Sequence, residues 1–386
     1  MPTSLETSPL NRALDLARQA LWLTSPNPRV GCVITAADGT LLGEGHTQRA
    51  GGPHAEIMAL RDAATRGHSV QGATAWVTLE PCAHQGRTGP CCDALAAAGI
   101  GRVVSAMHDP NPKVAGQGMA RLAAAGVQTE TLHPTSNIAV QARELNIGFF
   151  SRMERSLPWV RMKVAASLDG QTALQNGQSQ WITGPEARAD GHAWRARACA
   201  ILTGIGTVLE DDPLLNVRGM DTPRQPHLVV VDSRLDMPLS AKLLDTQGTG
   251  DQARQIWIYT ATSEQVDKRA ALTARGVTVI DCPGSGGKVD LLAMLRDLAR
   301  REINELHVEA GHKLNGSFIR EGLVDEFLVY LAPQLLGPGQ GLANLPALTE
   351  LSGAVRLAFH AMDRIGPDLR LLLRRQTDDG ASQRLL

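Results

Sequence analysis

One histidine, one glutamate and two cysteines are the residues of this chain whose types and spacing could do chemistry. His54 and Glu56 stand two residues apart in "GGPHAEIMAL", where an apolar helical pattern begins. Cys82 and Cys91, with eight residues between them, stand in "EPCAHQGRTGPCC", after the strand-like run "ATAWVTL". Taken alone, His-Ala-Glu would be an ordinary polar first turn of a helix. The two cysteines give it a second interpretation.

An imidazole nitrogen and two thiolates bind zinc and leave one tetrahedral position for water, which is typical of a catalytic zinc site. Each ligand would lie where a strand ends and a helix begins, and helix N-termini favour thiolates. Glu56 need not bind the metal, because from the first helical turn it can take a proton from the zinc-bound water and return it to a leaving amine. The spacing therefore predicts a hydrolytic zinc site with His54, Cys82 and Cys91 as ligands.

The composition predicts a globular protein of two domains without a strong electrostatic field. The chain has 386 residues, of which 43% are hydrophobic, and its 38 basic residues balance 39 acidic ones. A nucleic-acid partner loses support because such binding normally leaves a basic stripe. A membrane partner is not expected either, because no run reaches about 18 apolar residues. The start of the chain lacks a secretory pattern, so we expect a cytoplasmic protein whose cysteines bind metal or are buried.

Short apolar runs alternate with helical patterns in the first half, which predicts an α/β sandwich with some parallel strand pairing. Helices are expected at 11–23, 55–65 and 92–98, and strands at "RVGCVIT", "ATAWVTL" and "RVVSAM". The pattern breaks at "LNIGFFSRMERSLPWV", between Ile147 and Pro158. The expected domains are therefore residues 1–147 and 158–386.

The second half has its own α/β pattern, with helices expected at 185–199 and 289–301. Its strand-like runs are "WVRMKVAAS", "AILTGIG", "HLVVVD", "QIWIYT", "VTVID", "ELHVEAG" and "EFLVYLAP". No GxGxxG follows the first run, so a Rossmann domain is not predicted. "EAGHKLNGS" can instead end a strand and open a helix whose free N–H groups meet pyrophosphate oxygens.

Motifs in both halves resemble one family of bifunctional enzymes. "NPRVGCVI", "GEGHTQRAGGPHAE", "TLEPCAHQGRTGPC" and "DPNPKVAG" are similar to the deaminase half of the riboflavin-biosynthesis deaminase/reductase family, including a Cys gap longer than the two residues of other zinc deaminases. "KVAASLDGQTA", "GQSQWITG", "GTVLEDDPLLNVR", "VVDS" and "VEAGHKLNGSFI" are similar to its reductase half. The resemblance implies an N-terminal cytidine-deaminase-like α/β/α sandwich and a C-terminal dihydrofolate-reductase-like α/β domain that uses NADPH.

In the deaminase half, the resemblance implies that His54, Cys82 and Cys91 bind zinc and that Glu56 moves the proton. Cys92 is then a buried bystander. The resemblance also places Asn27, His84 and Arg87 at the substrate. Arg87 would suit a phosphate because its guanidinium is always charged, although His84 and Arg87 could be solvated loop residues and Asn27 part of a plain turn. Thr47 and Gly89 stand where the family often has His and Pro.

In the reductase half, the resemblance implies one binding site for the cofactor and one for the substrate. The NADPH site would contain Ala165, Trp181, Thr207, Asp211, Ser233, Gly311, His312, Lys313, Leu314, Asn315, Gly316 and Ser317. The substrate site would contain Ser179, Arg195, Leu215, Arg218 and Glu309, with the two arginines at the 5′-phosphate. Lys163 and Glu309 are candidates for polarising or protonating the sugar. A structural ion pair is an equal alternative for Lys163.

The expected function is zinc-dependent deamination of 2,5-diamino-6-(5-phosphoribosylamino)pyrimidin-4(3H)-one. The product, 5-amino-6-(5-phosphoribosylamino)uracil, would then be reduced by NADPH from a ribosyl to a ribityl chain. The alternatives are a nucleoside or nucleic-acid deaminase with a non-catalytic appended domain, and a binding protein that has lost the chemistry. By resemblance, we expect a homodimer or higher homo-oligomer formed through the second domain.

Overall fold

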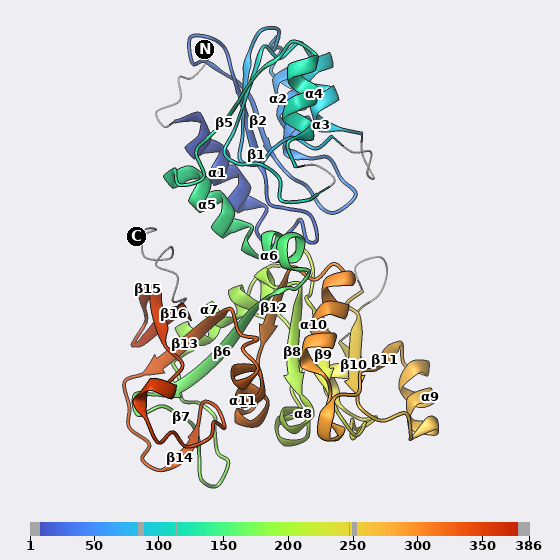
Figure 1. Ribbon diagram of the computed structural model, residues 1–386, viewed down its shortest axis with the longest axis vertical. Helices are drawn as coiled ribbons and strands as arrows, with labels where there is room; N and C mark the ends of the chain where they lie inside the picture. Colours follow the sequence, from blue (N-terminus) through green and yellow to red (C-terminus); the bar gives the residue numbers. More distant parts are fainter. Residues whose placement is uncertain (1–7, 84–88, 113–114, 247, 249–252, 377–386) are drawn as a thin grey trace. The chain divides into compact units, whose positions relative to one another are not determined.

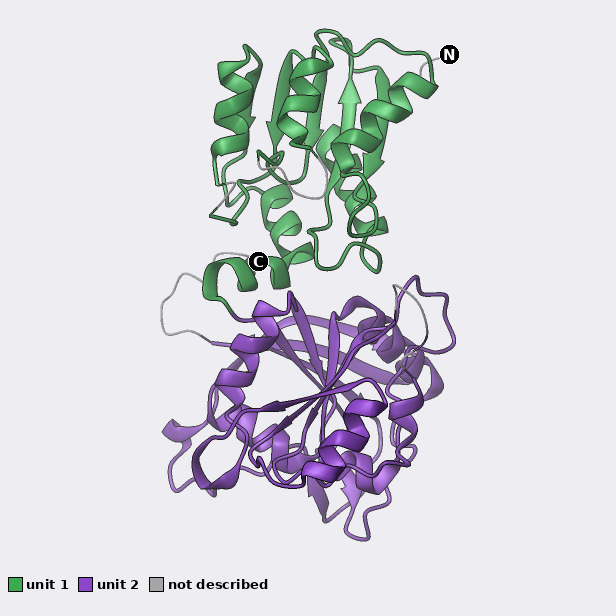
Figure 2. Ribbon diagram, turned by 90° about the vertical axis from the view of Figure 1, so that its right-hand side faces the viewer, with its two compact units in different colours: residues 1–156, 385–386 green, residues 157–384 purple. Residues whose placement is uncertain are grey.

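The computed structural model describes residues 8–83, 89–112, 115–246, 248 and 253–376. The chain forms two compact units, and the first ends at Ser156 where the second begins at Leu157 (Figure 2). Each unit has its own β-sheet and its own hydrophobic core. Within the described ranges, the helices are all too short or too polar to cross a bilayer.

The first unit is built on a five-stranded sheet with the order β2-β1-β3-β4-β5. β1 pairs antiparallel with β2 and β3, and β3, β4 and β5 are parallel. The strands are β1 (Gly31–Thr35), β2 (Leu41–His46), β3 (Thr74–Val77), β4 (Arg102–Ser105) and β5 (Gln128–Thr131). The helices are α1 (Pro9–Gln19), α2 (Ala55–Thr65), α3 (Cys91–Ala97), α4 (Gln117–Ala124), α5 (Asn137–Leu145) and α6 (Ile147–Arg155).

Helices cover both faces of this sheet, with α2, α3 and α4 on one side and α1 and α5 on the other (Figure 1). α2 lies close to β2 because two glycines leave room for its backbone. A Cβ at Gly43 would lie 2.4 Å from the carbonyl oxygen of Ala59, and one at Gly45 would lie 2.5 Å from Cβ of Met58. The contact fixes the start of α2, where His54 and Glu56 lie. The expected α/β/α sandwich is confirmed.

The stretch expected to separate the domains is mostly helical. α6 continues past Ile147, and its Phe149 and Phe150 are buried in the core of the first unit. The helix ends at Ser156, whose φ of 57° is in the left-handed region. The first unit therefore extends about nine residues beyond the expected end at 147, because two phenylalanines outweigh the basic residues around them.

The second unit is built on a nine-stranded sheet with the order β11-β10-β9-β8-β12-β6-β13-β16-β15, and β14 pairs separately with β7. The first seven strands in this order, from β11 through β13, are parallel to one another. β16 then pairs antiparallel with β13, and β15 pairs antiparallel with β16. The strands are β6 (Trp159–Ser167), β7 (Gln171–Leu174), β8 (Ala200–Gly204), β9 (His227–Val231), β10 (Ile256–Thr260), β11 (Val277–Asp281), β12 (Glu305–Val308), β13 (Glu326–Ala332), β14 (Gly339–Gly341), β15 (Leu357–Ile365) and β16 (Asp368–Arg375). The helices are α7 (Pro185–Arg197), α8 (Ile205–Asp211), α9 (Val266–Ala274), α10 (Leu291–Arg300) and α11 (His312–Arg320), with short 3-10 turns at Lys242–Asp245, Ser285–Gly287 and Leu351–Gly353.

Alternating apolar residues bury both faces of this sheet. In β10, Trp257 and Tyr259 belong to the core cluster that contains α10 and α11, while Ile256 and Ile258 belong to the cluster that contains residues of α8 and α9. α7 is different, because only Ala187 and Ala196 of its thirteen residues are buried. Its polar residues Arg188, His192 and Arg195 are therefore available to line a cavity.

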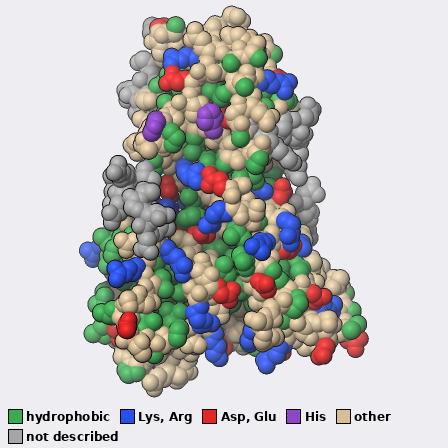
Figure 3. Space-filling model, in the orientation of Figure 1, with side chains coloured by type: hydrophobic (Ala, Val, Ile, Leu, Met, Phe, Trp, Pro, Cys, Tyr) green, Lys and Arg blue, Asp and Glu red, His purple; other side chains and the backbone are tan. Residues whose placement is uncertain are grey.

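The strand-like runs of the second half correspond to β6, β8, β9, β10, β11, β12 and β13, and the expected helices to α7 and α10. Six further strands were not expected from the sequence: β2, β5, β7, β14, β15 and β16. β15 is largely exposed and its sequence "LAFHAMDRI" mixes apolar and charged residues, so it carries no core pattern. Figure 3 shows basic and acidic side chains interspersed on the visible face, in line with the balanced composition.

Candidate functional site

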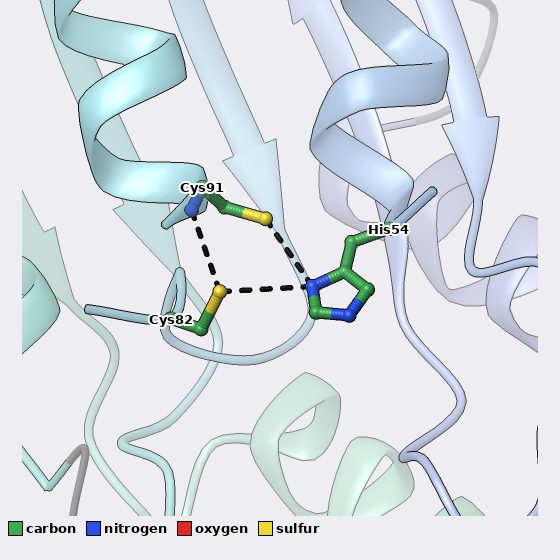
Figure 4. Close-up of side chains that lie close together, drawn as sticks. All are labelled: His54, Cys82 and Cys91. Atoms are coloured by element: carbon green, nitrogen blue, oxygen red, sulfur yellow. Dashed lines mark hydrogen bonds between the residues drawn. The ribbon is translucent and has the colours of Figure 1, made fainter. Parts of the chain in front are cut away.

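The three predicted zinc ligands lie together in the first unit (Figure 4). His54 is the N-cap of α2, Cys91 is the first residue of α3, and Cys82 follows β3. Nδ1 of His54 lies 3.6 Å from Sγ of Cys82 and 3.3 Å from Sγ of Cys91. All three ligand atoms lie within 4.8 Å of one another. A nitrogen and two sulfurs at this separation are a donor set that fits Zn²⁺.

The N-terminus of α3 favours negative charge on Cys82. The backbone N–H of Cys91 donates to Sγ of Cys82 at 3.4 Å. A hydrogen bond from the Cys91 thiol lowers the pKa of Cys82 to about 4, and the same contact together with burial raises the pKa of Cys91. Cys92 points elsewhere, because its Sγ lies 3.7 Å from a carboxylate oxygen of Asp93. Its placement agrees with the expected bystander role.

Glu56 lies in the first turn of α2 and is only 3% exposed. Burial, with a smaller contribution from the charge of Cys82, raises the pKa of Glu56 to about 7. A carboxyl group with a pKa near the operating pH can both accept and donate a proton. The structure thus places a buried carboxyl group with a raised pKa beside the three predicted zinc ligands.

The other predicted residues of this half are less informative. Asn27 is half-buried, and its backbone N–H donates to the carbonyl of Thr24 at 2.9 Å, which makes it part of a turn. His84 and Arg87 lie outside the described residues. Thr47 is buried, and its hydroxyl donates to the carbonyl of Val30 at 3.4 Å. The roles of these residues at the substrate stay predictions.

The second unit contains a cavity of about 960 Å³ next to the end of β12 and the start of α11. This is the usual position of a ligand in an open parallel sheet, beyond the carboxyl ends of the strands. Predicted site residues that line the cavity are Lys163, Ala165, Ser179, Trp181, Arg195, Thr207, Asp211, Leu215, Arg218, Glu309, Gly311, His312 and Asn315. The structure therefore brings together residues from β6 to α11 that are far apart in the sequence.

Arg195 and Glu309 bind each other. Nε and Nη2 of Arg195 donate to the two carboxylate oxygens of Glu309 at 2.5 and 2.8 Å, and Nη1 donates to the carbonyl of Asn216 at 3.1 Å. Burial would raise the pKa of Glu309, but the charges of Arg195 and Lys163 outweigh it and hold that pKa well below its usual range. This favours the carboxylate form of Glu309, and its role in polarising or protonating the sugar stays a prediction.

Lys163 is the better candidate for moving a proton. Burial lowers its pKa, and the charge of Glu309 only partly opposes this shift. Its ammonium lies 5.9 Å from the ring centroid of Tyr330 and faces the cavity. Arg218 is exposed and donates to Oδ1 of Asn216 at 2.8 Å. Because this partner is a neutral amide and not a carboxylate, the charge of Arg218 is more available to a phosphate than that of Arg195.

Only part of the predicted NADPH set lines the cavity. The residues that do not are Ser233, Lys313, Leu314, Gly316 and Ser317. Leu314 packs against the main core, and a Cβ at Gly316 would lie 2.2 Å from the carbonyl of Asn344. The hydroxyl of Ser233 accepts the backbone N–H of Val289 at 3.2 Å. Within Gly311–Ser317, Gly311, His312 and Asn315 line this cavity, and the roles of the other residues stay predictions.

One buried atom at the cavity has an unsatisfied hydrogen-bonding capacity. The amide nitrogen of Asn315 donates to the carbonyl of Leu342 at 3.0 Å, but its Oδ1 has no partner among the described residues. Gly311 precedes it as the N-cap of α11, where backbone N–H groups are free of intrahelical partners. A polar ligand with phosphate and amide groups, such as a nicotinamide dinucleotide, fits these groups.

Several lining residues were missed by the sequence analysis. Arg188, Gly191 and His192 join Arg195 on the cavity face of α7. Their spacing of three, four and seven residues is that of one helical face and could have identified them. Thr172 and Gln340 come from the β7/β14 pair, which carried no recognisable pattern.

Comparison with known proteins agrees with both sites. Residues 5–107 match the cytidine and deoxycytidylate deaminase zinc-binding region, and residues 158–371 match the RibD C-terminal domain. The riboflavin biosynthesis protein RibD of Escherichia coli is 43% identical over 370 residues, which covers 94% of this chain and 97% of that protein. The RibD structure from Acinetobacter baumannii is 39% identical, with a TM-score of 0.85 over 96% of this chain and 98% of the other.

A structure from Thermotoga maritima, described as a diaminohydroxyphosphoribosylaminopyrimidine deaminase and 5-amino-6-(5-phosphoribosylamino)uracil reductase, is 28% identical with a TM-score of 0.81 and covers 95% of this chain and 98% of its own. The fold and the sites thus define a bifunctional enzyme, a zinc-dependent deaminase joined to a reductase. The chain belongs to the RibD family of riboflavin biosynthesis proteins.

These matches confirm the family, the fold class and the bifunctional enzyme expected from the sequence. The expected cofactors, zinc for the deaminase and NADPH for the reductase, follow the same assignment. The alternative of a nucleoside or nucleic-acid deaminase with a non-catalytic appended domain is not supported, because the second unit matches the reductase domain of the family along most of its length.

Proposed function

We propose that this chain deaminates 2,5-diamino-6-(5-phosphoribosylamino)pyrimidin-4(3H)-one in its first unit and reduces 5-amino-6-(5-phosphoribosylamino)uracil in its second. The observation that carries the deaminase proposal is the group formed by His54, Cys82 and Cys91 with buried Glu56 beside it. The first domain corresponds to the expected residues 1–147 together with α6, and the second to 158–386.

In the deaminase, His54 and the two cysteines hold the metal, and Glu56 handles the protons. Zinc, when bound, lowers the pKa of its water from near 16 to roughly 7. Glu56 would accept a proton from the attacking water and then donate a proton to the nitrogen that leaves the amine-bearing ring carbon. The C–N bond breaks, ammonia leaves, and the ring carbon becomes a carbonyl. Because Glu56 is buried, bulk water does not compete for the proton.

In the reductase, the cavity holds substrate and cofactor together. NADPH, when bound, supplies a hydride to C1′ of the ribosyl group. Lys163 is our candidate for donating a proton to the ring oxygen as the sugar opens, because its lowered pKa makes it a better acid than an ordinary lysine. The Arg195–Glu309 ion pair links α7 to the end of β12 at the cavity, and Arg218 binds the 5′-phosphate. A volume of about 960 Å³ is at the upper end of the roughly 300–1,000 Å³ of small-molecule sites, which suits two ligands.

We also propose that the protein is a homodimer formed through the second unit. β15 is the edge strand of the nine-stranded sheet, and Phe359 and Met362 on it are 58% and 66% exposed. Leu351 nearby in the sequence is 89% exposed. An edge strand with exposed apolar side chains is a typical interface. Met362→Lys should give monomers in sedimentation velocity, whereas Val266→Lys, at an equally exposed position on α9, should not.

A cytoplasmic location is the last part of the proposal. All six cysteines are free thiols, and two of them must stay thiolates to hold zinc. Such sites are best maintained in a reducing compartment. Fractionation of the source cells with antibody detection would test this directly.

The activity test is a coupled assay on the full chain. Ammonia release is measured with the diaminopyrimidinone phosphate as substrate, and NADPH oxidation is measured with the aminouracil phosphate supplied separately. Both reactions should proceed. Ammonia release without NADPH oxidation would leave the second unit without its proposed activity, and the opposite result would do the same for the first.

A further inference from the structure

A buried carboxylate outside the metal-ligating group fastens the segment that carries Cys82. Glu80 follows β3 and precedes Pro81 and Cys82, and its side chain is 0% exposed. The mechanism above gives it no role, and no arginine or lysine pairs with it among the described residues. Two titratable groups face it: His108, with Nδ1 at 3.2 Å from Oε2, and Asp109, whose pKa the charge of Glu80 helps burial to raise.

Backbone N–H groups compensate this carboxylate instead. Oε1 accepts the N–H groups of Gly118 at 2.9 Å and Met119 at 3.2 Å. Oε2 accepts those of Gly116 at 2.9 Å and Asp109 at 3.2 Å. Three of the four donors belong to the N-cap and first turn of α4, where the N–H groups have no intrahelical partners and the helix dipole favours an anion. Glu80 therefore caps α4 from a distant part of the chain.

The same helix holds the residue on the other side of Cys82. Nη1 of Arg121, one turn further along α4, donates to the carbonyl of Ala83 at 3.3 Å, and Arg121 also pairs with Asp93 of α3 at 2.7 Å. The chain lies flush against the helix start, because a Cβ at Gly118 would lie 1.9 Å from the carbonyl oxygen of Pro81. The residues before and after Cys82 are thus both hydrogen-bonded to α4. The contact made by Glu80 is buried, so it should be stronger than the more exposed contact made by Arg121.

We propose that Glu80 is a positioning residue for the metal centre, which holds the Cys82 thiolate at ligating distance by binding the start of α4. It acts through Cys82 and does not touch metal or substrate. The inference rests on the proposed deaminase only for its activity readout, since zinc retention can be measured without substrate. Groups that orient metal ligands typically change metal affinity by about 10- to 100-fold when they are replaced.

The variant that tests the proposal is Glu80→Gln. Glutamine has the same size but only one accepting oxygen, and its amide group would face two N–H donors in either orientation. At least two of the four backbone donors therefore lose their partner. Glu130→Gln is the matched control, because Glu130 is an exposed glutamate of the same unit that pairs with Arg102 at the surface.

The experiment uses zinc-loaded full-length protein and measures the rate of zinc transfer to a chromogenic chelator. We expect Glu80→Gln to release zinc about 10- to 100-fold faster than wild type, and Glu130→Gln to release it within twofold of wild type. Deaminase kcat per bound zinc should fall while KM changes less than twofold. Reduction of the aminouracil phosphate by the same sample should be unchanged, because the reductase is a separate unit.

A purely structural role would lower the melting temperature of the first unit but leave zinc release and kcat per zinc within twofold of wild type, and this would overturn the proposal. If Glu80→Gln does not fold, Glu80→Asp is used, because it keeps the charge but shortens the reach to the four donors. Its zinc release should also be faster than wild type, and an unchanged rate would refute positioning. Wild-type protein that holds zinc tightly but releases no ammonia would refute the proposed deaminase and not the role of Glu80.

Discussion

Replacing Glu56 by glutamine is the most direct test of the deaminase chemistry. The amide occupies the same volume, so the 3%-exposed site is neither emptied nor overfilled, and the three metal-ligating side chains are untouched. What is lost is a group whose pKa burial has raised to about 7, close to the optimum for moving a proton at neutral pH. The metal and the fold should therefore remain while proton transfer fails.

The expected loss follows from the energetics of positioned proton transfer. Such transfer commonly contributes about 10²- to 10⁴-fold in rate, which is about 3–5 kcal/mol of barrier at roughly 1.4 kcal/mol per decade. We expect ammonia release by Glu56→Gln to fall at least 100-fold at saturating substrate. Zinc content, measured by atomic emission, should stay near one per chain.

The second unit provides an internal control in the same molecule. NADPH oxidation with separately supplied aminouracil phosphate should stay near the wild-type rate, because Glu56 and the reductase cavity belong to different units. Ammonia release by Glu56→Gln at the full rate would mean that His-Ala-Glu is only an ordinary polar start of a helix. Loss of both activities with zinc retained would contradict two separable sites.

Three further predictions concern the metal, the phosphate and the pH dependence of stability. Cys91→Ser should lose zinc while Cys92→Ser retains it, and the opposite pattern in metal analysis would overturn the ligand assignment. Arg218→Ala should raise KM for the aminouracil phosphate far more than KM for NADPH, and equal effects would refute a phosphate contact. Burial lowers the pKa of His227 to about 4, below its unfolded value of about 6.5, so protonation of this one residue in the unfolded state should cost the second unit up to ~3 kcal/mol as pH falls from about 6.5 to 4. His227→Asn keeps an acceptor for the N–H of Gln255 but does not titrate, so chemical denaturation should show a flatter pH profile, and an unchanged slope would exclude His227 as the cause.

The proximity of His54, Cys82 and Cys91 could be predicted from the sequence because the elements that carry them are local. His54 and Glu56 share one helical turn, and Cys82 and Cys91 flank one short connection, so strand ends and helix starts were enough to bring them together. The pairing of Arg195 with Glu309 could not be predicted in this way. The two residues are 114 positions apart, and either could bind a ligand until the sheet order places them side by side.

The strands also differ in how well the sequence predicts them. Buried parallel strands such as β9 and β10 have continuous apolar runs and were expected, whereas β15 is a largely exposed antiparallel edge strand without such a run. The four N–H donors to Glu80 are a further case, because backbone groups carry no sequence signal of their own. α6 shows the reverse, since its two phenylalanines are visible in the sequence, but the clustered basic residues and Pro158 were interpreted as a break in the pattern.

The order of strands in the two sheets has a consequence for synthesis on the ribosome. The first sheet, β2-β1-β3-β4-β5, pairs strands that are at most two positions apart in chain order, so it can be completed once Thr131 has emerged. In the second sheet β6 lies between β12 and β13, so this strand, which ends at Ser167, stays without either neighbour until residues 305–332 are made. Late, non-local pairing is slow and leaves apolar edges open. The deaminase can thus mature early on the nascent chain, while the reductase depends on the end of translation and is the half that most needs protection from aggregation.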